Sequence, residues 1–272
     1  TAVKTTYRGN LEMINFDLGT YLKDTVNFQS VSLRGDITGR GLTKANADFK
    51  LNGKIASIGI LGYNYSNIIT NARFASQLFN GQLSINDPNL KLNAIGSIDF
   101  RKKHEEVKIK ATLDTLLLKE LNFSKEPLFL SSQIDIDSKG LQIDSLFGDM
   151  ILKESVFQYQ DRRIEFDSIH LSSELTGKTR KLSLISSLAD LHLEGDYYYS
   201  TLFQDVNTLF YEFMLNIRND KGQLRQYYAE KKKSTQVYDA KLAATLYNIN
   251  PVIKLLGIDA TASKNIEIEG KF

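Results

Sequence analysis

The chain has 272 residues, of which 42% are hydrophobic, and its 34 Lys and Arg against 32 Asp and Glu give a net charge of +2. This balance argues against a nucleic-acid-binding protein, whose affinity comes from an excess of basic residues. The absence of cysteine excludes disulfides, thiolate zinc sites and cysteine nucleophiles. The sequence has no run of about 18 apolar residues, so it predicts no membrane-spanning helix.

Alternating hydrophobicity predicts strands along most of the chain. Apolar residues recur at every second position around 31–37, 49–55, 83–85, 107–113, 134–136, 182–184, 191–193, 209–217 and 266–268. Each such strand has one apolar and one polar face, which is typical of antiparallel sheets. Short turn signals separate the strands, and the run Asn86-Asp87-Pro88-Asn89 predicts a type I turn.

Helical signals are few and short. We expect helices near 17–24, 223–233 and 250–257, the last with Asn250 as N-cap, Pro251 at the first helical position and Gly257 at its end. No low-complexity linker marks an internal boundary, so residues 1–272 are expected to form one continuous unit. The predicted fold class is all-β with a few short helices.

A glycine beside alternating apolar residues recurs at 35–39, 52–55, 80–85, 95–100 and 268–272. This weak repeat favours stacked units over one closed barrel, although glycine is also common at strand ends. Two architectures fit the pattern. One is a closed sandwich whose apolar faces bury each other. The other is an open, curled sheet whose apolar face remains available for a ligand or a partner.

Few residues are candidates for catalysis or metal binding. The three histidines have no metal-ligand spacing, and His192 falls on the polar side of its strand. Asp135 and Asp137 point to one polar face, which favours solvated carboxylates over an acid–base pair. No nucleophile elbow or phosphate-binding loop occurs. We therefore expect no enzyme, cofactor or metal site, and a hydrolase using the two aspartates stays open as an alternative.

Two clusters, one of tyrosines and one of lysines, are interpreted as structural features rather than binding sites. Tyr197, Tyr198 and Tyr199 predict aromatics on both faces of one strand, where packing is favoured over base stacking. The run 231–233 of three lysines follows two tyrosines. It favours a solvated helix end over contact with anionic lipid headgroups.

Several segments together resemble the AsmA/TamB-like family of envelope proteins in its Bacteroidota form. The similar segments are residues 16–22, 51–58, 62–68, 79–90, 96–100, 121–123 and 248–257. The resemblance is best over 10–125 and 240–272 and looser over 140–235. The Asn-Asp-Pro-Asn-Leu motif at 86–90 is its most specific part.

This resemblance implies a long, twisted, half-open antiparallel sheet, the β-taco or β-groove. It implies a non-enzymatic groove that binds phospholipid acyl chains and transfers lipid between the inner and outer membranes, in the periplasm of a Gram-negative envelope. The chain is then an internal segment of a longer protein that is anchored in the inner membrane through parts outside this segment. An alternative is a scaffold for outer-membrane protein assembly that works with an Omp85-type partner by strand addition.

Acyl chains would lie along the apolar side of each strand, where each buried CH₂ contributes about 0.8 kcal/mol. The expected lining residues are the aligned apolar ones: Leu33, Ile37, Phe49, Leu51, Ile55, Leu83, Ile85, Val107, Ile109, Leu113, Ile134, Ile136, Leu191, Leu193, Phe213 and Leu215.

Overall fold

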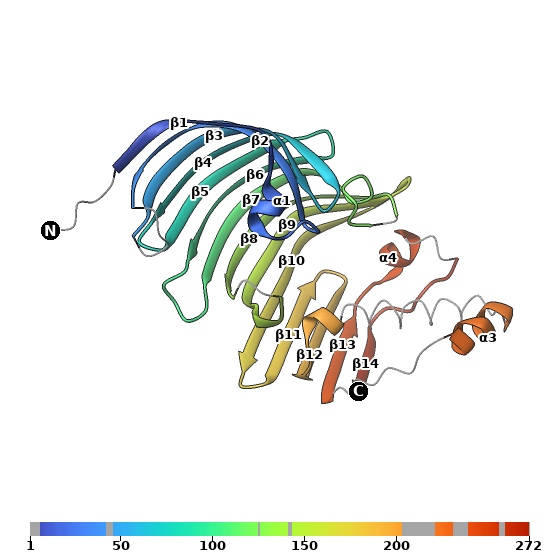
Figure 1. The fold of residues 1–272 in the computed structure, drawn as a ribbon. Helices are drawn as coiled ribbons and strands as arrows, with labels where there is room; N and C mark the ends of the chain where they lie inside the picture. Colours follow the sequence, from blue (N-terminus) through green and yellow to red (C-terminus); the bar gives the residue numbers. More distant parts are fainter. Residues whose placement is uncertain are drawn as a thin grey trace.

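In the computed structural model, the described residues form a single antiparallel sheet of fourteen strands with a few short helices (Figure 1). The structure describes residues 6–41, 46–124, 126–140, 143–202, 221–230, 239–255 and 259–271. Every strand pairs with its neighbours in sequence, and the sheet does not close into a barrel. The all-β, open-sheet prediction is therefore confirmed, and these residues do not form a closed sandwich.

The strands are β1 (Thr6–Asp17), β2 (Phe28–Arg40), β3 (Asp48–Ile60), β4 (Tyr63–Ala75), β5 (Leu78–Asn86), β6 (Leu90–Asp99), β7 (Glu106–Leu117), β8 (Leu128–Lys139), β9 (Phe147–Tyr159), β10 (Arg162–Thr176), β11 (Thr179–Ser186), β12 (Ala189–Asp196), β13 (Asp239–Leu246) and β14 (Ile266–Lys271). Odd-numbered strands end at the side of the sheet that carries α1, which we call the α1 end.

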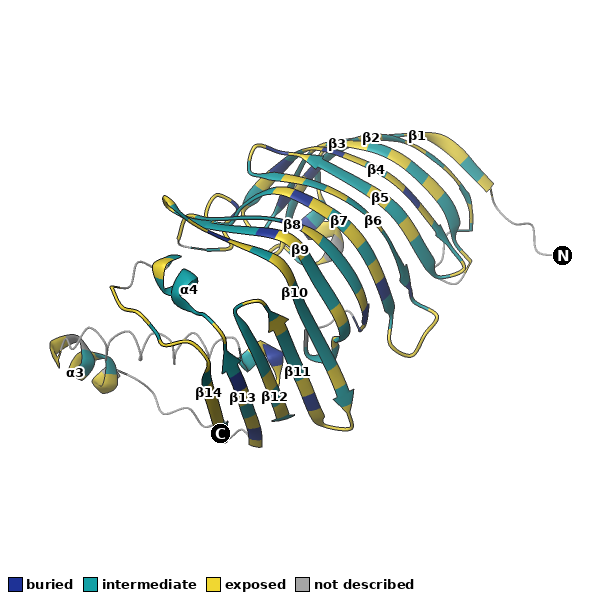
Figure 2. Cartoon of the chain, turned by 180° about the vertical axis from the view of Figure 1, so that it is seen from behind, coloured by how far each residue is buried: buried dark blue, intermediate teal, exposed yellow. Residues whose placement is uncertain are grey.

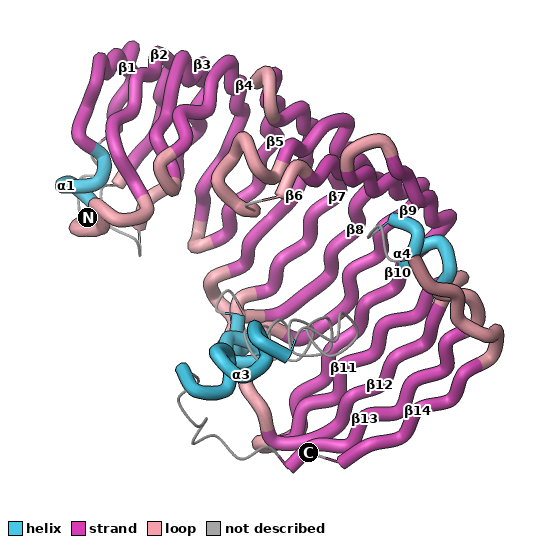
Figure 3. Tube along the Cα trace, turned by 90° about the vertical axis from the view of Figure 1, so that its right-hand side faces the viewer, coloured by secondary structure: helices cyan, strands magenta, loops and turns pink. Residues whose placement is uncertain are grey.

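The helices lie in connections between strands. They include α1 (Leu18–Leu22), α3 (Lys221–Glu230), α4 (Asn250–Leu255) and the 3-10 helix η1 (Ile143–Ser145), and residues 199–202 are helical as well. Helix α1 contacts β2 and α4 contacts β10 (Figure 3). The helices expected at 17–24, 223–233 and 250–257 overlap α1, α3 and α4. Residues 231–233 and 256–257, and the strand expected at 209–217, lie outside the described residues.

Exposure alternates along each strand, because successive side chains point to opposite faces of the sheet (Figure 2). In neighbouring strands, residues of the same kind lie opposite each other. Leu33 pairs with Ile55, and Ile55 pairs with Ile68, on one face. Arg34 pairs with Lys54 on the other face. Since side chains alternate across the sheet with a period of two, the register keeps the apolar residues together.

A row of irregular pairings crosses the sheet near the α1 end. Register shifts occur between Met13 and Phe16 in β1, Leu113 and Leu116 in β7, and Ser131 and Gln133 in β8. Asn15, Asn67 and Glu154 near this row have left-handed backbone, with φ of 49°, 52° and 49°. Bulges bend a strand and increase its twist, in agreement with the curved strands in Figure 1.

Two glycines explain part of the sequence repeat. A Cβ atom on Gly35 would lie 2.5 Å from the carbonyl oxygen of Asn52, and one on Gly96 would lie 2.5 Å from that of Lys108. Both glycines occupy the side of the sheet that carries Leu33 and Ile109. Because no side chain fits at these distances, glycine allows the close approach of neighbouring strands there.

Candidate functional site

Most apolar residues of the fourteen strands lie on one continuous face, which we call the apolar face, whereas isolated ones such as Ile95 and Ile185 lie on the opposite face. One row of paired positions shows this continuity, because each member lies opposite the next in the adjacent strand. In strand order the row is Gly9, Ile37, Leu51, Ala72, Gly81, Gly96, Ile109, Ile136, Met150, Leu171, Leu184, Leu191, Ala244 and Ile268.

No polar side chain interrupts this row. At a strand spacing of about 4.8 Å, fourteen strands extend the row over about 60 Å. The hydrocarbon layer of one bilayer leaflet is only about 15 Å thick. The row is therefore several times longer than one acyl chain needs.

Fourteen of the sixteen predicted lining residues lie on the apolar face. They are Leu33, Ile37, Phe49, Leu51, Ile55, Leu83, Ile85, Val107, Ile109, Leu113, Ile134, Ile136, Leu191 and Leu193. The other two, Phe213 and Leu215, lie outside the described residues.

Sequence reasoning missed part of the face. Ile68 and Ala72 of β4 are both buried there, and Met150 and Leu171 continue the central row in β9 and β10. The alternation of Ile68, Thr70, Ala72 and Phe74 is present in the sequence. Its small and polar members weaken the signal that would have identified the strand.

A loop covers the apolar face at the α1 end. Leu121, in the connection between β7 and β8, has no exposed surface and packs against Tyr65 and Ile68. These three residues form the Leu121 cluster, which partly buried residues of β3 to β7 surround. The β7–β8 connection therefore closes this part of the face.

A buried carboxylate supports the Leu121 cluster. Asp87, in the turn between β5 and β6, accepts hydrogen bonds from the Tyr63 hydroxyl at 2.6 Å, from the Ser66 backbone N–H at 2.9 Å and from the Asn89 N–H at 2.9 Å. Burial acts to raise the pKa of Asp87, but these hydrogen bonds outweigh it and lower the pKa. The Asn86 to Asn89 motif is thus an internal anchor of the turn.

A second cover lies at the opposite end of the sheet, next to β12. Tyr197 and Tyr199 are buried and pack with Ala240 against the apolar face, together forming the Tyr197 cluster. The prediction that Tyr197 to Tyr199 belong to a strand was wrong, because β12 ends at Asp196. The chain turns there, which places Tyr197 and Tyr199 over the sheet and leaves Tyr198 exposed.

Polar groups hold this second cover in place. The buried Arg180 guanidinium lies 5.3 Å from the ring centre of Tyr198 and 5.6 Å from that of Tyr199, and it donates to the Asp144 carbonyl. The Asp144 carboxylate accepts from the Ser200 N–H at 3.0 Å and from its hydroxyl at 2.6 Å. Burial acts to raise the pKa of Asp144, but the bonds from Ser200 lower it overall.

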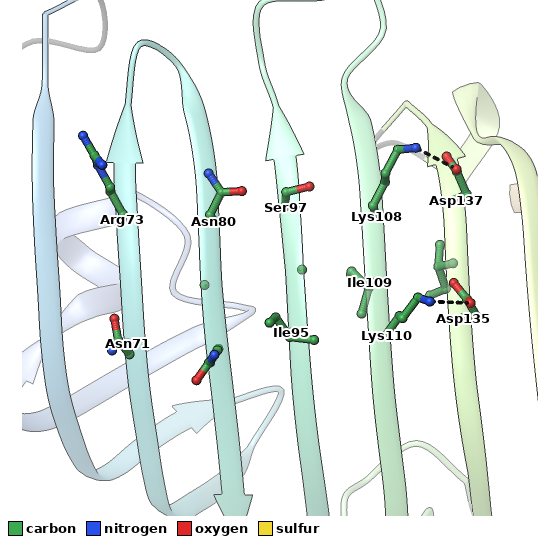
Figure 4. A pocket seen from close by; sticks show the side chains of 14 residues that line it. Asn71, Arg73, Asn80, Ile95, Ser97, Lys108, Ile109, Lys110, Asp135 and Asp137 are labelled. Carbon is green, nitrogen blue, oxygen red and sulfur yellow. Dashed lines mark hydrogen bonds and ion pairs between the residues drawn. The ribbon is translucent and has the colours of Figure 1, made fainter.

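The opposite, polar face carries cross-strand charges (Figure 4). Lys108 pairs with Asp137 at 2.9 Å and Lys110 with Asp135 at 3.5 Å. These pairs border a shallow depression of about 760 Å³ that Asn71 and Arg73 also line. In Figure 4, the blue ribbon of the N-terminal strands passes behind the sheet, so the sheet curls toward the apolar face.

The two histidines of the polar face have hydrogen-bond partners on neighbouring strands. His170 Nε2 lies 2.8 Å from Asp149 Oδ1, and His192 Nδ1 lies 3.1 Å from Ser183 Oγ. Within the described ranges, no group of three or more His, Asp or Glu residues is arranged to hold a metal ion. Asp135 and Asp137 belong to cross-strand ion pairs, which are typical of a solvated sheet face.

Comparisons with protein families, with curated proteins and with solved structures found no match for this chain. Among the residues that the structure describes, no helix has the length and apolar character to cross a membrane.

Proposed function

We propose that the apolar face binds phospholipid acyl chains and that the chain is a non-enzymatic lipid-binding and transfer groove. The observation that carries this proposal is the uninterrupted apolar row across all fourteen strands. The main contacts between the described elements are those of adjacent strands, of α1 with β2 and of α4 with β10, so no second sheet covers the row. An apolar surface of this extent requires a ligand or a partner.

The shape of the face favours transfer over tight storage. Each buried CH₂ contributes about 0.8 kcal/mol, so an acyl chain gains several kcal/mol wherever it lies along the row. Because every strand offers an apolar position to the row, the acyl chain keeps apolar contact as it slides from strand to strand. Headgroups remain at the open side of the curled sheet in this arrangement.

The cellular setting follows from the resemblance of the sequence to AsmA/TamB-like proteins. We place the chain in the periplasm, as part of a longer protein anchored in the inner membrane and acting in phospholipid transport to the outer membrane. The proposed partner of this protein is an Omp85-type outer-membrane protein.

Extraction of bound lipid from detergent-free protein, followed by mass spectrometry, tests the proposal. We expect about one or more phospholipids per wild-type chain. The substitution Ile109→Asp places a charge in the middle of the row and should remove most of this lipid. Ile185→Asp, at an exposed position on the polar face, is the matched control and should retain it. A folded wild-type chain without lipid would contradict the proposal.

A second candidate function is a scaffold that binds partner strands. The edge strands β1 and β14 each pair on one side only, and such edges accept further strands. Under this alternative the folded chain carries no lipid. A strand-forming peptide added in excess would then protect the amides of β1 or β14 against hydrogen exchange.

A further inference from the structure

Exposed apolar side chains gather on neighbouring loops at the α1 end. Val26 is 80% exposed and Tyr21 is 72% exposed in the connection between β1 and β2. Leu61 in the turn between β3 and β4 is 42% exposed, and Phe123 between β7 and β8 is 53% exposed. We call these four residues the apolar rim.

Hydrogen bonds join the loops of the apolar rim. The Leu61 N–H donates to the carbonyl of Asn27, next to Val26, at 2.9 Å. The side-chain amide of Asn122, next to Phe123, donates to the Leu61 carbonyl at 3.4 Å. Residues distant in sequence are therefore held on one side of the sheet.

Leu61 occupies a conformation that disfavours its side chain. Its φ is 50° and that of Gly62 is 77°, so both turn residues have the positive φ that type I′ hairpin turns require. Asn, Asp or Gly is favoured at the first position of such a turn, where this turn has leucine. The turn between β4 and β5, by comparison, has two polar residues with positive φ, Ser76 and Gln77. Leu61 thus combines a strained backbone with an exposed apolar side chain, and such a combination favours an external contact.

The apolar rim lies directly beside the covered end of the apolar face. Asn122 and Phe123 follow Leu121, whose side chain packs on Tyr65 and Ile68. The inner side of this loop thus belongs to the apolar face and its outer side to the rim. A surface that contacts lipid here is continuous with the face that we propose to bind lipid.

We propose that the apolar rim inserts into the surface of a lipid bilayer and sets the α1 end of the groove against it. The proposal rests on the proposed function in that it names the edge through which the groove meets lipid. Separate apolar tips among exposed polar residues such as Lys23, Asn64 and Lys119 suit the headgroup boundary, where an aromatic or aliphatic tip is buried and its polar neighbours stay wet. A protein interface would instead require a contiguous, close-packed core.

The chain contains no tryptophan, so one introduced tryptophan reports its own environment. Phe123→Trp places the probe in the apolar rim, and Leu146→Trp places it on an exposed position at the opposite end of the sheet. With vesicles of phosphatidylethanolamine and phosphatidylglycerol, we expect a blue-shifted emission and quenching by brominated acyl chains for Phe123→Trp only. Equal responses of the two probes, or no response of either, would overturn the proposal.

Vesicle flotation tests the same surface without a probe. The double substitution Val26→Asp with Phe123→Asp should lower the vesicle-bound fraction at least ten-fold, whereas Ile185→Asp on the polar face should leave it unchanged. Circular dichroism checks that each variant is folded. If the double variant floats as the wild type does, the rim proposal fails, and lipid extraction from the same samples shows separately whether the groove still carries lipid. Binding to a protein but not to vesicles would also overturn the proposal.

Discussion

The two covers of the apolar face close it by different chemistry. The Leu121 cluster is an apolar contact, in which a leucine without exposed surface packs on Tyr65 and Ile68. The Tyr197 cluster also contains buried aromatics, but its connection to the sheet depends on Arg180 and on the hydrogen bonds of Asp144. Both covers thus exclude water from buried side chains, with the neutral donors of Asp87 beside the first and the charged Arg180 in contact with the second.

This difference suggests different roles for the two ends. Opening of either cover exposes buried apolar side chains, at a cost that grows with the area exposed. The second cover is held in addition by hydrogen bonds to Asp144, which exchange with water when the cover opens. We therefore expect the Tyr197 cluster to open through these exchangeable bonds, and the Leu121 cluster to remain a fixed part of the apolar face.

Truncation of Leu121 should have the largest effect. Leu121→Ala removes the fully buried side chain from the centre of its cluster, so the free energy of unfolding should fall by about 2–5 kcal/mol. Urea denaturation measures the change. The matched control is Phe123→Ala, two residues along the same loop and exposed, which should cost less than about 0.5 kcal/mol. Equal losses at the two positions would show that the loop does not cover the apolar face.

Removal of the Arg180 side chain should have the next largest effect. Arg180→Ala deletes the contact with two tyrosine rings and the hydrogen bond to Asp144, and we expect a loss of about 2–3 kcal/mol. It should also raise the amount of lipid bound per chain, because the Tyr197 cluster is released from the face. Lys181→Ala is the control, since Lys181 forms an exposed ion pair with Glu194 at 3.5 Å and should contribute little.

The two faces of the sheet could be predicted from the sequence because their pattern is local. Alternation assigned Leu33, Ile109 and Leu191 to one side, and the paired register places them on one face. A local irregularity limits this reasoning. Tyr65 is three residues from Ile68, so strict alternation predicts opposite faces, yet both belong to the Leu121 cluster. The left-handed Asn67 between them changes the direction of the strand.

The covers could not be predicted, because they depend on contacts between distant segments. Leu121 resembled any other loop leucine, and nothing in the local pattern linked it to β4. Similarly, the alternation before Asp196 gave no sign that the chain would turn there and place Tyr197 on the sheet. The position of Arg180 under that turn became visible only in three dimensions.

The carboxylate beside the Leu121 cluster should give this region a distinct pH dependence. Asp87 has a lowered pKa in the folded chain, so its hydrogen bonds stabilise the fold above the ordinary aspartate pKa of about 3.9. This stabilisation is lost as the pH falls through the lower, folded pKa. Asp87→Asn should cost about 1–2 kcal/mol at pH 7, and the difference from wild type should shrink below pH 4 in urea denaturation. A difference that stays constant with pH would contradict this role.

A smaller effect is expected at the polar connection of the second cover. Ser200→Ala removes the hydroxyl that donates to Asp144 at 2.6 Å but keeps the backbone N–H bond, so the loss should be about 0.5–1 kcal/mol. The pKa of Asp144 should rise toward its ordinary value, which NMR titration of the carboxyl group measures. Thr201→Ala is the control, because the Thr201 hydroxyl donates to the Tyr198 carbonyl at 3.1 Å and not to Asp144. If the cover opens through this connection, Ser200→Ala should also speed amide exchange at Tyr199 while exchange at Leu121 stays unchanged. Faster exchange at both positions would mean that the two covers open together and are not independent.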